Sequence, residues 1–165
     1  AYTLAKSERK FDKTGINRGE WFPFRYDRRH RINLTLNHKF SDHIDAGASW
    51  EFYTGATTTL GEEKKIAINP SDVPGLDGSI NEGLSLTEVN TIYSRNNYRM
   101  PSSHCLHVGI NFRKQKNYGE RIWNFSIYNI YNGMNPTLIY RENGNTLYRV
   151  TLFPLIPSFT YTYIF

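Results

Sequence analysis

Hydrophobic and polar residues alternate in several separate segments of this chain. In the segment 156–165 one face carries aromatic side chains and the other carries hydroxyl side chains; the aromatic residues are Phe159, Tyr161, Tyr163 and Phe165. Because successive side chains of a β-strand point to opposite faces, this period of two predicts a strand. The same period occurs in the segments 31–40, 43–53, 105–113 and 123–128, and more weakly in 2–7. The pattern predicts six main antiparallel strands.

The polar side of these predicted strands carries charges. Arg31 and Lys39 lie opposite the apolar residues of 31–40, and Asp45 and Glu51 lie opposite those of 43–53. A water-soluble sandwich of two sheets would also show one apolar face per strand, and it stays the alternative. A dry core tolerates such charges only when they are paired, whereas a barrel in a membrane directs them into a polar lumen. The alternation therefore favours an all-β, antiparallel transmembrane β-barrel.

The connections between the predicted strands alternate in length. Short turns fall near 41–42 and 115–119, and long segments fall at about 8–29, 54–103 and 131–150. Outer-membrane barrels have short periplasmic turns and long extracellular loops. We therefore expect the three long segments outside the cell and the C-terminus in the periplasm of a diderm bacterium.

Six strands cannot close a barrel in lipid, because an open sheet edge leaves backbone groups without hydrogen bonds. Ala1 is not an initiator Met and no signal segment precedes the first predicted strand, so we expect part of a larger barrel. An alternative remains open. The segments 137–140 and 146–152 flank Asn143-Gly144-Asn145 and would add two strands. That would give a complete small eight-stranded outer-membrane barrel with a structural or adhesive role.

Five passages of the chain resemble one family. They are 20–30 (EWFPFRYDRRH), 97–101 (NYRMP), 128–132 (YNIYN) with Asn135-Pro136, 152–158 (LFPLIPS) and the terminal Phe165. In this order and spacing they resemble the C-terminal barrel portion of TonB-dependent outer-membrane receptors of the Bacteroidetes type. The resemblance implies a 22-stranded barrel with an N-terminal plug, of which residues 1–165 supply the last six strands but not the plug. It implies active nutrient uptake, with this segment forming lumen wall and extracellular loops.

The resemblance also implies partners. These are outer-membrane lipid and lipopolysaccharide, the protein's own plug and remaining strands, the TonB complex through the missing N-terminal part, the barrel-assembly machinery and, in some members, a surface lipoprotein lid. The assembly machinery reads the terminal strand of similar proteins, which assigns the assembly signal to Phe159, Tyr161, Tyr163 and Phe165. Cys105 and His107 depart from the family pattern, where a basic and an acidic residue are more usual. Plug contacts at these two positions are therefore in doubt.

Four residues near the predicted outer mouth are candidates for substrate binding: Trp21, Arg25, Tyr53 and Arg99. Trp21 is suited to stack on a ligand or to anchor the protein at the membrane boundary. Arg25 is suited to bind an anionic solute or lipopolysaccharide phosphate. The net charge of +5 does not change this picture, because the basic residues are scattered among acids and amides. No groove typical of nucleic-acid binding is predicted.

Metal binding and catalysis find little support. Cys105 and His107 share a strand face but His104 does not, and two ligands do not make a zinc site. A single Cys also excludes an internal disulfide. The oxygen-rich loop residues Asp72, Asp77, Asn81 and Glu82 lack the spacing of a helix-loop-helix calcium site. The chain has no nucleophile elbow, phosphate loop or HExxH motif, so we expect no enzyme and no cofactor.

Overall fold

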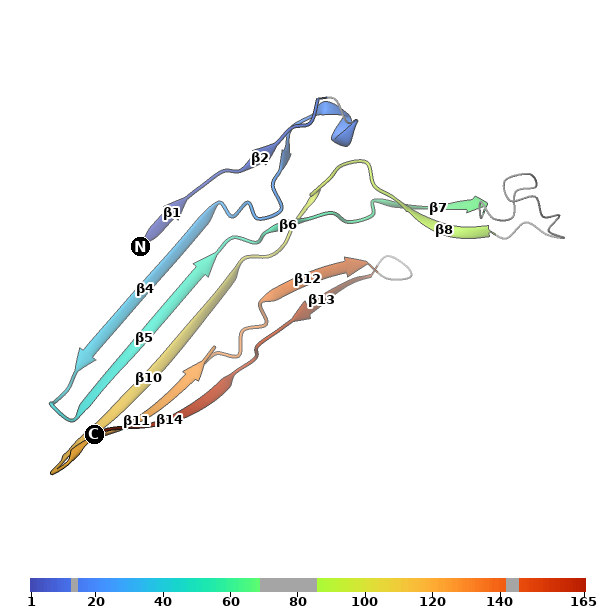
Figure 1. The fold of residues 1–165 in the computed structure, drawn as a ribbon. Helices are drawn as coiled ribbons and strands as arrows, with labels where there is room; N and C mark the ends of the chain where they lie inside the picture. The colour runs from blue at the N-terminus through green and yellow to red at the C-terminus, as the bar shows by residue number, and fades with distance from the viewer. Residues whose placement is uncertain (13–14, 69–85, 142–145) are drawn as a thin grey trace.

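The computed structural model describes residues 1–12, 15–68, 86–141 and 146–165. Among these residues the one helical element is the short 3-10 helix η1 (Ile16–Gly19). Six strands form one antiparallel sheet in the order β1-β4-β5-β10-β11-β14 (Figure 1). They are β1 Tyr2–Leu4, β4 His30–Lys39, β5 Ile44–Tyr53, β10 Ser103–Lys116, β11 Gly119–Tyr128 and β14 Ile156–Ile164. The prediction of an all-β, antiparallel fold is confirmed, and the described sheet is open, with β1 and β14 at its edges.

The opening strand β1 is shorter than the predicted segment 2–7 and ends at Leu4. Beyond it, the backbone N–H of Ser7 donates to the carboxylate of Asp27. The Ala5 N–H still donates to the Arg29 carbonyl, and the chain continues into β2 (Glu8–Arg9), which pairs with β3 (Phe22–Pro23), the strand that precedes β4. The residues after Leu4 therefore stay beside the segment that precedes β4, and the strand ladder is interrupted only between β1 and β2.

The strand register groups similar side chains on each surface of the sheet. Leu34 of β4 lies opposite Trp50 of β5, which lies opposite Leu106 of β10. On the other surface Asp45 of β5 lies opposite Asn111 of β10. We call these surfaces the apolar face and the polar face. A slip of one residue between neighbouring strands would exchange the two faces, so the alternation in the sequence specifies the register.

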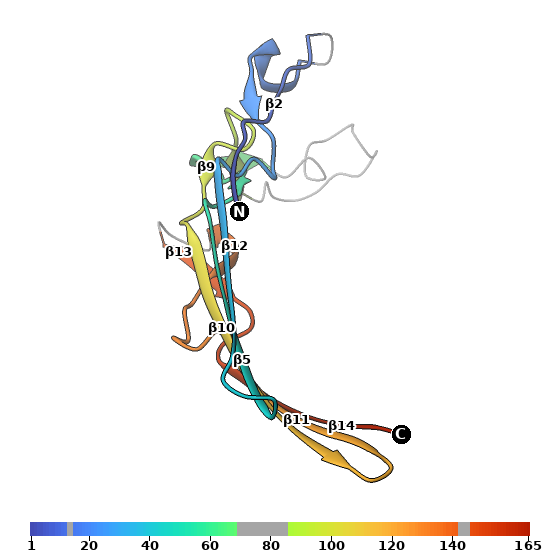
Figure 2. The same ribbon diagram turned by 90° about the vertical axis from the view of Figure 1, so that its left-hand side faces the viewer.

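The sheet is a single curved layer, as the edge-on view shows (Figure 2). Its apolar face is largely uncovered, with Leu36 70%, Leu34 56% and Phe159 52% exposed. In the described part of the chain the buried hydrophobic residues are Phe22, Ala56, Leu60, Cys105 and Ile139, and only Cys105 belongs to the six-stranded sheet. Burying one large apolar side chain stabilises a protein by roughly 1.5–3 kcal/mol. The described residues do not provide this burial for the apolar face.

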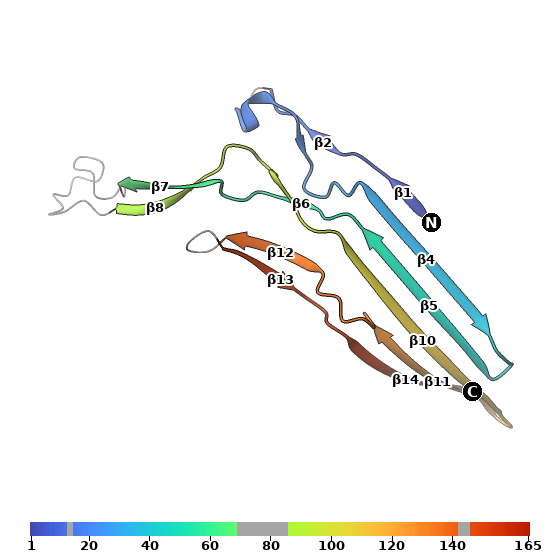
Figure 3. The same ribbon diagram turned by 180° about the vertical axis from the view of Figure 1, so that it is seen from behind.

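The connections at the two ends of the sheet differ, as seen from both sides in Figures 1 and 3. Residues 40–43 join β4 to β5, and Asn117 and Tyr118 join β10 to β11. We call this the turn end. The opposite end carries the described residues of 5–29, 54–102 and 129–155, and we call it the loop end. The described strands of the second and third connections are β6 Thr57–Thr58, β7 Glu63–Ile68, β8 Leu86–Thr91, β9 Tyr98–Arg99, β12 Pro136–Arg141 and β13 Leu147–Thr151.

The two strands that the eight-stranded alternative requires are present, but they do not join the main sheet. Strands β12 and β13 pair with each other in a separate two-stranded sheet. The predicted turn residues 143–145 between them lie outside the described residues. The described structure therefore gives a six-stranded sheet with a hairpin at its loop end, not an eight-stranded sheet.

Candidate functional site

The loop end is organised around Asp27, which follows β3 and is only 1% exposed. Its Oδ1 accepts from the Ser7 backbone N–H at 2.7 Å, and its Oδ2 accepts from Arg29 Nε at 3.0 Å and from Arg99 Nη2. Burial alone would raise the pKa of Asp27. The bonds from Ser7, Arg99 and Arg29 outweigh it, so that the pKa lies below the ordinary value. Asp27 is therefore a buried, charged acceptor that holds three segments together.

Arg99 completes this junction from β9. Its Nη1 donates to the backbone carbonyl of Asp27 at 2.7 Å and to that of Gly55 at 2.9 Å. The chain passes so close here that a Cβ atom on Gly55 would lie 1.8 Å from the Met100 carbonyl oxygen. Only glycine fits at this crossing. The Arg99 bonds and the close approach together bring the end of β5, the first connection and β9 into one unit.

Two neighbouring asparagines hold the second connection in place. Asn96, in the left-handed region with φ 54°, donates from Nδ2 to the Pro23 carbonyl at 2.8 Å. Asn97 donates to the Leu60 carbonyl at 2.9 Å and to Glu62 Oε1 at 2.8 Å. The Asn97 bond lowers the pKa of Glu62 and outweighs the opposing effect of burial. The Asn96 bond links the first and second connections across 73 residues of sequence, and the Asn97 bonds join two parts of the second connection.

The third connection has its own central residue, Asn129, which is 1% exposed. It also has a positive φ, 54°. Its Nδ2 donates to the carbonyls of Gly133 at 3.0 Å and Phe153 at 3.2 Å, and its Oδ1 accepts from the Gly133 N–H at 2.9 Å. One side chain therefore closes the turn after β11 and fastens it to the segment before β14.

His107 connects this turn to the polar face of the sheet. Its Nδ1 accepts from the Asn129 backbone N–H at 3.3 Å, and its Nε2 lies 3.6 Å from Glu51 Oε1. The ring stacks on Tyr128 with 4.4 Å between centroids. The Cys105 sulfur lies 3.9 Å from Nδ1. Cys105 and His107 do share one face, as predicted, and among the described residues no three His, Cys, Asp or Glu side chains are grouped to hold a metal ion.

A row of polar side chains crosses the polar face nearer the turn end. Asn111 Nδ2 donates to Asp45 Oδ2 at 2.7 Å, and Asn124 Nδ2 donates to Asn111 Oδ1 at 2.7 Å. Arg113 Nε donates to Asp45 Oδ1 at 2.8 Å. The row spans β5, β10 and β11, and it presents both hydrogen-bond donors and acceptors on the polar face.

The four predicted substrate-binding residues occupy different places at the loop end. Trp21 is 64% exposed. Arg25 is exposed, with its guanidinium carbon 5.7 Å from the Tyr26 ring centroid. Tyr53 ends β5 and lies under the Arg28 guanidinium at 4.0 Å. Arg99 binds Asp27 and Gly55, so its charged group is engaged within the protein. The structure therefore leaves Trp21 and Arg25 open to solvent and places Arg99 in the junction.

Sequence reasoning did not single out Asp27, Asn96 or Asn129 as the residues that organise the loop end. A signal for the two asparagines existed, because Asn is among the few residues that readily adopt positive φ. No comparable local signal marks Asp27, because its partners Ser7 and Arg99 lie 20 and 72 residues away in the chain. The oxygen-rich residues Asp72, Asp77, Asn81 and Glu82 lie outside the described residues.

Comparison of the chain with protein-family models, with curated proteins and with solved structures finds no match. None of the helical residues in the described part of the chain forms a helix long and apolar enough to cross a membrane. Function is therefore inferred from the two faces of the sheet, from the loop end and from the sequence motifs.

Proposed function

We propose that this chain forms wall and extracellular loops of a TonB-dependent outer-membrane transporter for nutrient uptake. The observation that carries the proposal is the single-layer sheet with one exposed apolar face and one hydrogen-bonded polar face. A continuous apolar surface of this kind is unfavourable in water, whereas lipid covers it without loss. The polar face then lines the lumen, where the Asp45 row and Glu51 remain hydrated.

The dimensions of the apolar face suit a bilayer. On β5 this face runs from Ile44 to Phe52, which corresponds to about 27 Å along an antiparallel strand. A strand tilted by roughly 40° would then cover about 20 Å of membrane thickness, close to the roughly 25 Å apolar band of outer-membrane barrels. The strands are therefore long enough to cross the apolar interior.

The open edges support a larger barrel. Strands β1 and β14 each pair on one side only among the described residues. In lipid each unpaired backbone group would destabilise the sheet by several kcal/mol, so both edges require neighbouring strands. The family resemblance supplies a 22-stranded barrel in which these six strands form one part of the wall. The plug and the TonB-contacting segment would come from other parts of the protein.

In this mechanism the loop end faces the cell exterior and captures a substrate too large or too scarce for passive diffusion. The hydrogen bonds of Asp27, Asn96 and Asn129 hold the loops in place before substrate arrives, which reduces the entropy lost on binding. Exposed Trp21 and Arg25 are the side chains available to contact it. Energy delivered through TonB then displaces the plug, and the substrate passes along the polar face.

The test is the behaviour of the native gene product in an outer-membrane fraction, run on a gel with and without boiling. We expect a band that shifts on boiling and whose mass is many times the 19.3 kDa of this chain. A heat-shifted band near 19.3 kDa would instead support a complete small barrel. Recovery in the soluble fraction without a heat shift would contradict both membrane proposals.

A further inference from the structure

The charged residues of the apolar face are distributed unevenly. Among the described strands of the six-stranded sheet, this face carries three residues of the Lys, Arg, Asp and Glu types. They are Lys114, Lys116 and Arg121, all cationic and all at the turn end. The nearby acids lie elsewhere, since Asp45 and Glu120 belong to the polar face. The apolar face therefore ends in a basic border that no Asp or Glu of these strands shares.

The register places two of these cations directly opposite each other. Lys114 of β10 pairs with Arg121 of β11, and Arg121 in turn lies opposite Tyr163 of β14. Like charges in directly opposite positions are destabilising. All three cations are exposed, and no ion pair joins any of them to another described residue. An anion from outside the sheet that lies against these cations would relieve the repulsion.

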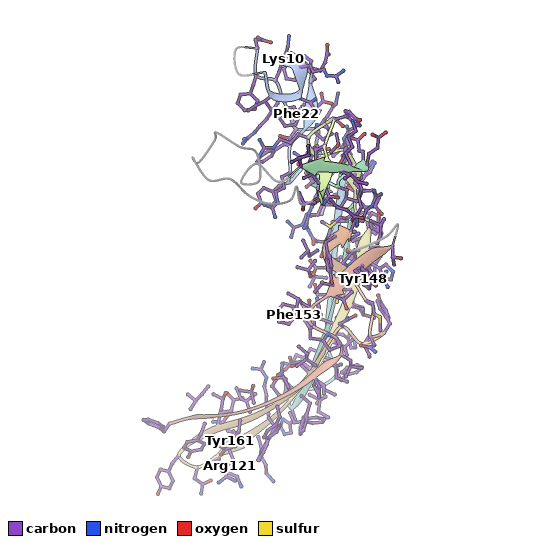
Figure 4. The ribbon with its side chains drawn as sticks, turned by 90° about the vertical axis from the view of Figure 1, so that its right-hand side faces the viewer. Lys10, Phe22, Arg121, Tyr148, Phe153 and Tyr161 are labelled. Carbon is purple, nitrogen blue, oxygen red and sulfur yellow. The ribbon has the colours of Figure 1, made fainter. Side chains whose placement is uncertain are left out.

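An aromatic row lies immediately before the basic border. Phe112, Trp123 and Tyr161 lie opposite one another across β10, β11 and β14, and the last two rings are 4.6 Å apart. Figure 4 shows Arg121 and Tyr161 close together at the turn end, far from Lys10 and Phe22 at the loop end. Aromatic residues favour the boundary between hydrocarbon and headgroups, and Lys and Arg extend from that boundary into the headgroups. With the apolar face in lipid, as proposed above, the cations lie at headgroup level.

We propose that Lys114, Lys116 and Arg121 bind the phosphates of anionic phospholipids at the turn end of the proposed barrel wall. The inference depends on the proposed membrane location and adds a specific lipid class to it. An ammonium group offers three donors and a guanidinium offers a planar fork, and both suit phosphate oxygens. A phosphate between Lys114 and Arg121 also removes their mutual repulsion. With the turns in the periplasm, these lipids belong to the inner, phospholipid leaflet.

The test uses the full-length native protein inserted into vesicles of phosphatidylcholine mixed with phosphatidylglycerol. The double variant Lys114→Gln/Arg121→Gln is compared with Lys10→Gln/Arg18→Gln, which removes the same charge at the loop end. Native mass spectrometry gives the ratio of retained phosphatidylglycerol to phosphatidylcholine. We expect the parent protein to prefer phosphatidylglycerol, and this preference to fall roughly fivefold for each border cation removed. The loop-end variant should keep the parent ratio, and so should Lys114→Arg/Arg121→Lys.

The possible failures are distinguishable. If the border variant inserts, shifts on boiling and retains phosphatidylglycerol as the parent does, the lipid inference is overturned and the transporter proposal stands. Equal losses in both double variants would also overturn it, because the effect would then follow net charge and not position. If the parent protein does not insert into vesicles at all, the membrane proposal fails together with this inference.

Discussion

At the scale of single residues, the loop end depends on one buried carboxylate. Asp27 joins the backbone of Ser7 to the guanidinium groups of Arg99 and Arg29, and its side chain is fully buried. A buried charge is stable only while its partners remain, so the same bonds that order the loops make them sensitive to substitution and to acid. Two predictions follow from this position.

The variant Asp27→Asn keeps the shape of the side chain and removes its charge. We expect the free energy of unfolding of the loop end to fall by on the order of 2 kcal/mol, because both guanidinium groups lose a charged acceptor. Hydrogen exchange at the Ser7 and Phe24 amides should become faster, while exchange in β5 and β10 should not change. The exposed Asp12→Asn, which affects only the Lys10 pair, should leave both amides as they are. Unchanged protection of Ser7 in Asp27→Asn would show that the carboxylate does not hold the loops.

Acid should loosen the same region. The pKa of Asp27 is lowered in the folded protein, so in acid the unfolded state binds more protons than the folded one. The stabilisation is therefore complete above the ordinary carboxyl pKa of about 4. It is lost as the pH falls through the lower pKa that Asp27 has in the folded protein. Ser7 exchange, corrected for its intrinsic pH dependence, should show this loss in the parent and not in Asp27→Asn. Identical pH profiles would contradict the assignment to Asp27.

At the scale of elements, the period of two was sufficient to predict the main strands but not the small ones. Strands β4, β5 and β14 follow the predicted segments closely, because each has many alternating residues. Strands β2, β3, β6 and β9 have two residues each, too few to show a period. Side chains from distant segments position them, as Thr57 Oγ1 does by donating to the Phe24 carbonyl at 2.8 Å. Non-local contacts of the same kind hold Arg99 in the junction with Asp27 and Gly55.

The crossing between the end of β5 and the segment after β9 should not tolerate a side chain. In Gly55→Ala the new Cβ would overlap the backbone carbonyl of Met100, so one of the two segments must move. We expect the loop end to be destabilised by about 1–3 kcal/mol and the Arg99 hydrogen bond to Gly55 to be lost. Gly109→Ala is the matched control, because its new Cβ would lie 3.4 Å from the Ser126 Cβ, which is an ordinary van der Waals distance. Thermal unfolding and exchange at residues 96–100 measure the difference, and equal behaviour of the two variants would contradict the close approach.

At the scale of the whole molecule, the described structure is built on a single curved six-stranded sheet and has no compact core. Its buried hydrophobic residues lie almost entirely at the loop end, and its longest strands have no described layer over their apolar face. The antiparallel fold and the two faces were predictable from the sequence, since both depend on alternation. The alternation does not indicate what lies beside the open edges at β1 and β14. The proposed membrane location therefore depends on what covers the apolar face.

Site-directed labelling along β5 tests that question most directly. Single cysteines are placed at each position from 44 to 53 in the membrane-inserted protein, with Cys105→Ser as background, and spin labels report collisions with oxygen and with a water-soluble nickel complex. We expect even-numbered positions to favour oxygen in lipid and odd-numbered positions to favour nickel in the lumen, in strict alternation. Even-numbered positions shielded from both reagents would show that protein packs on the apolar face, and would contradict the membrane wall.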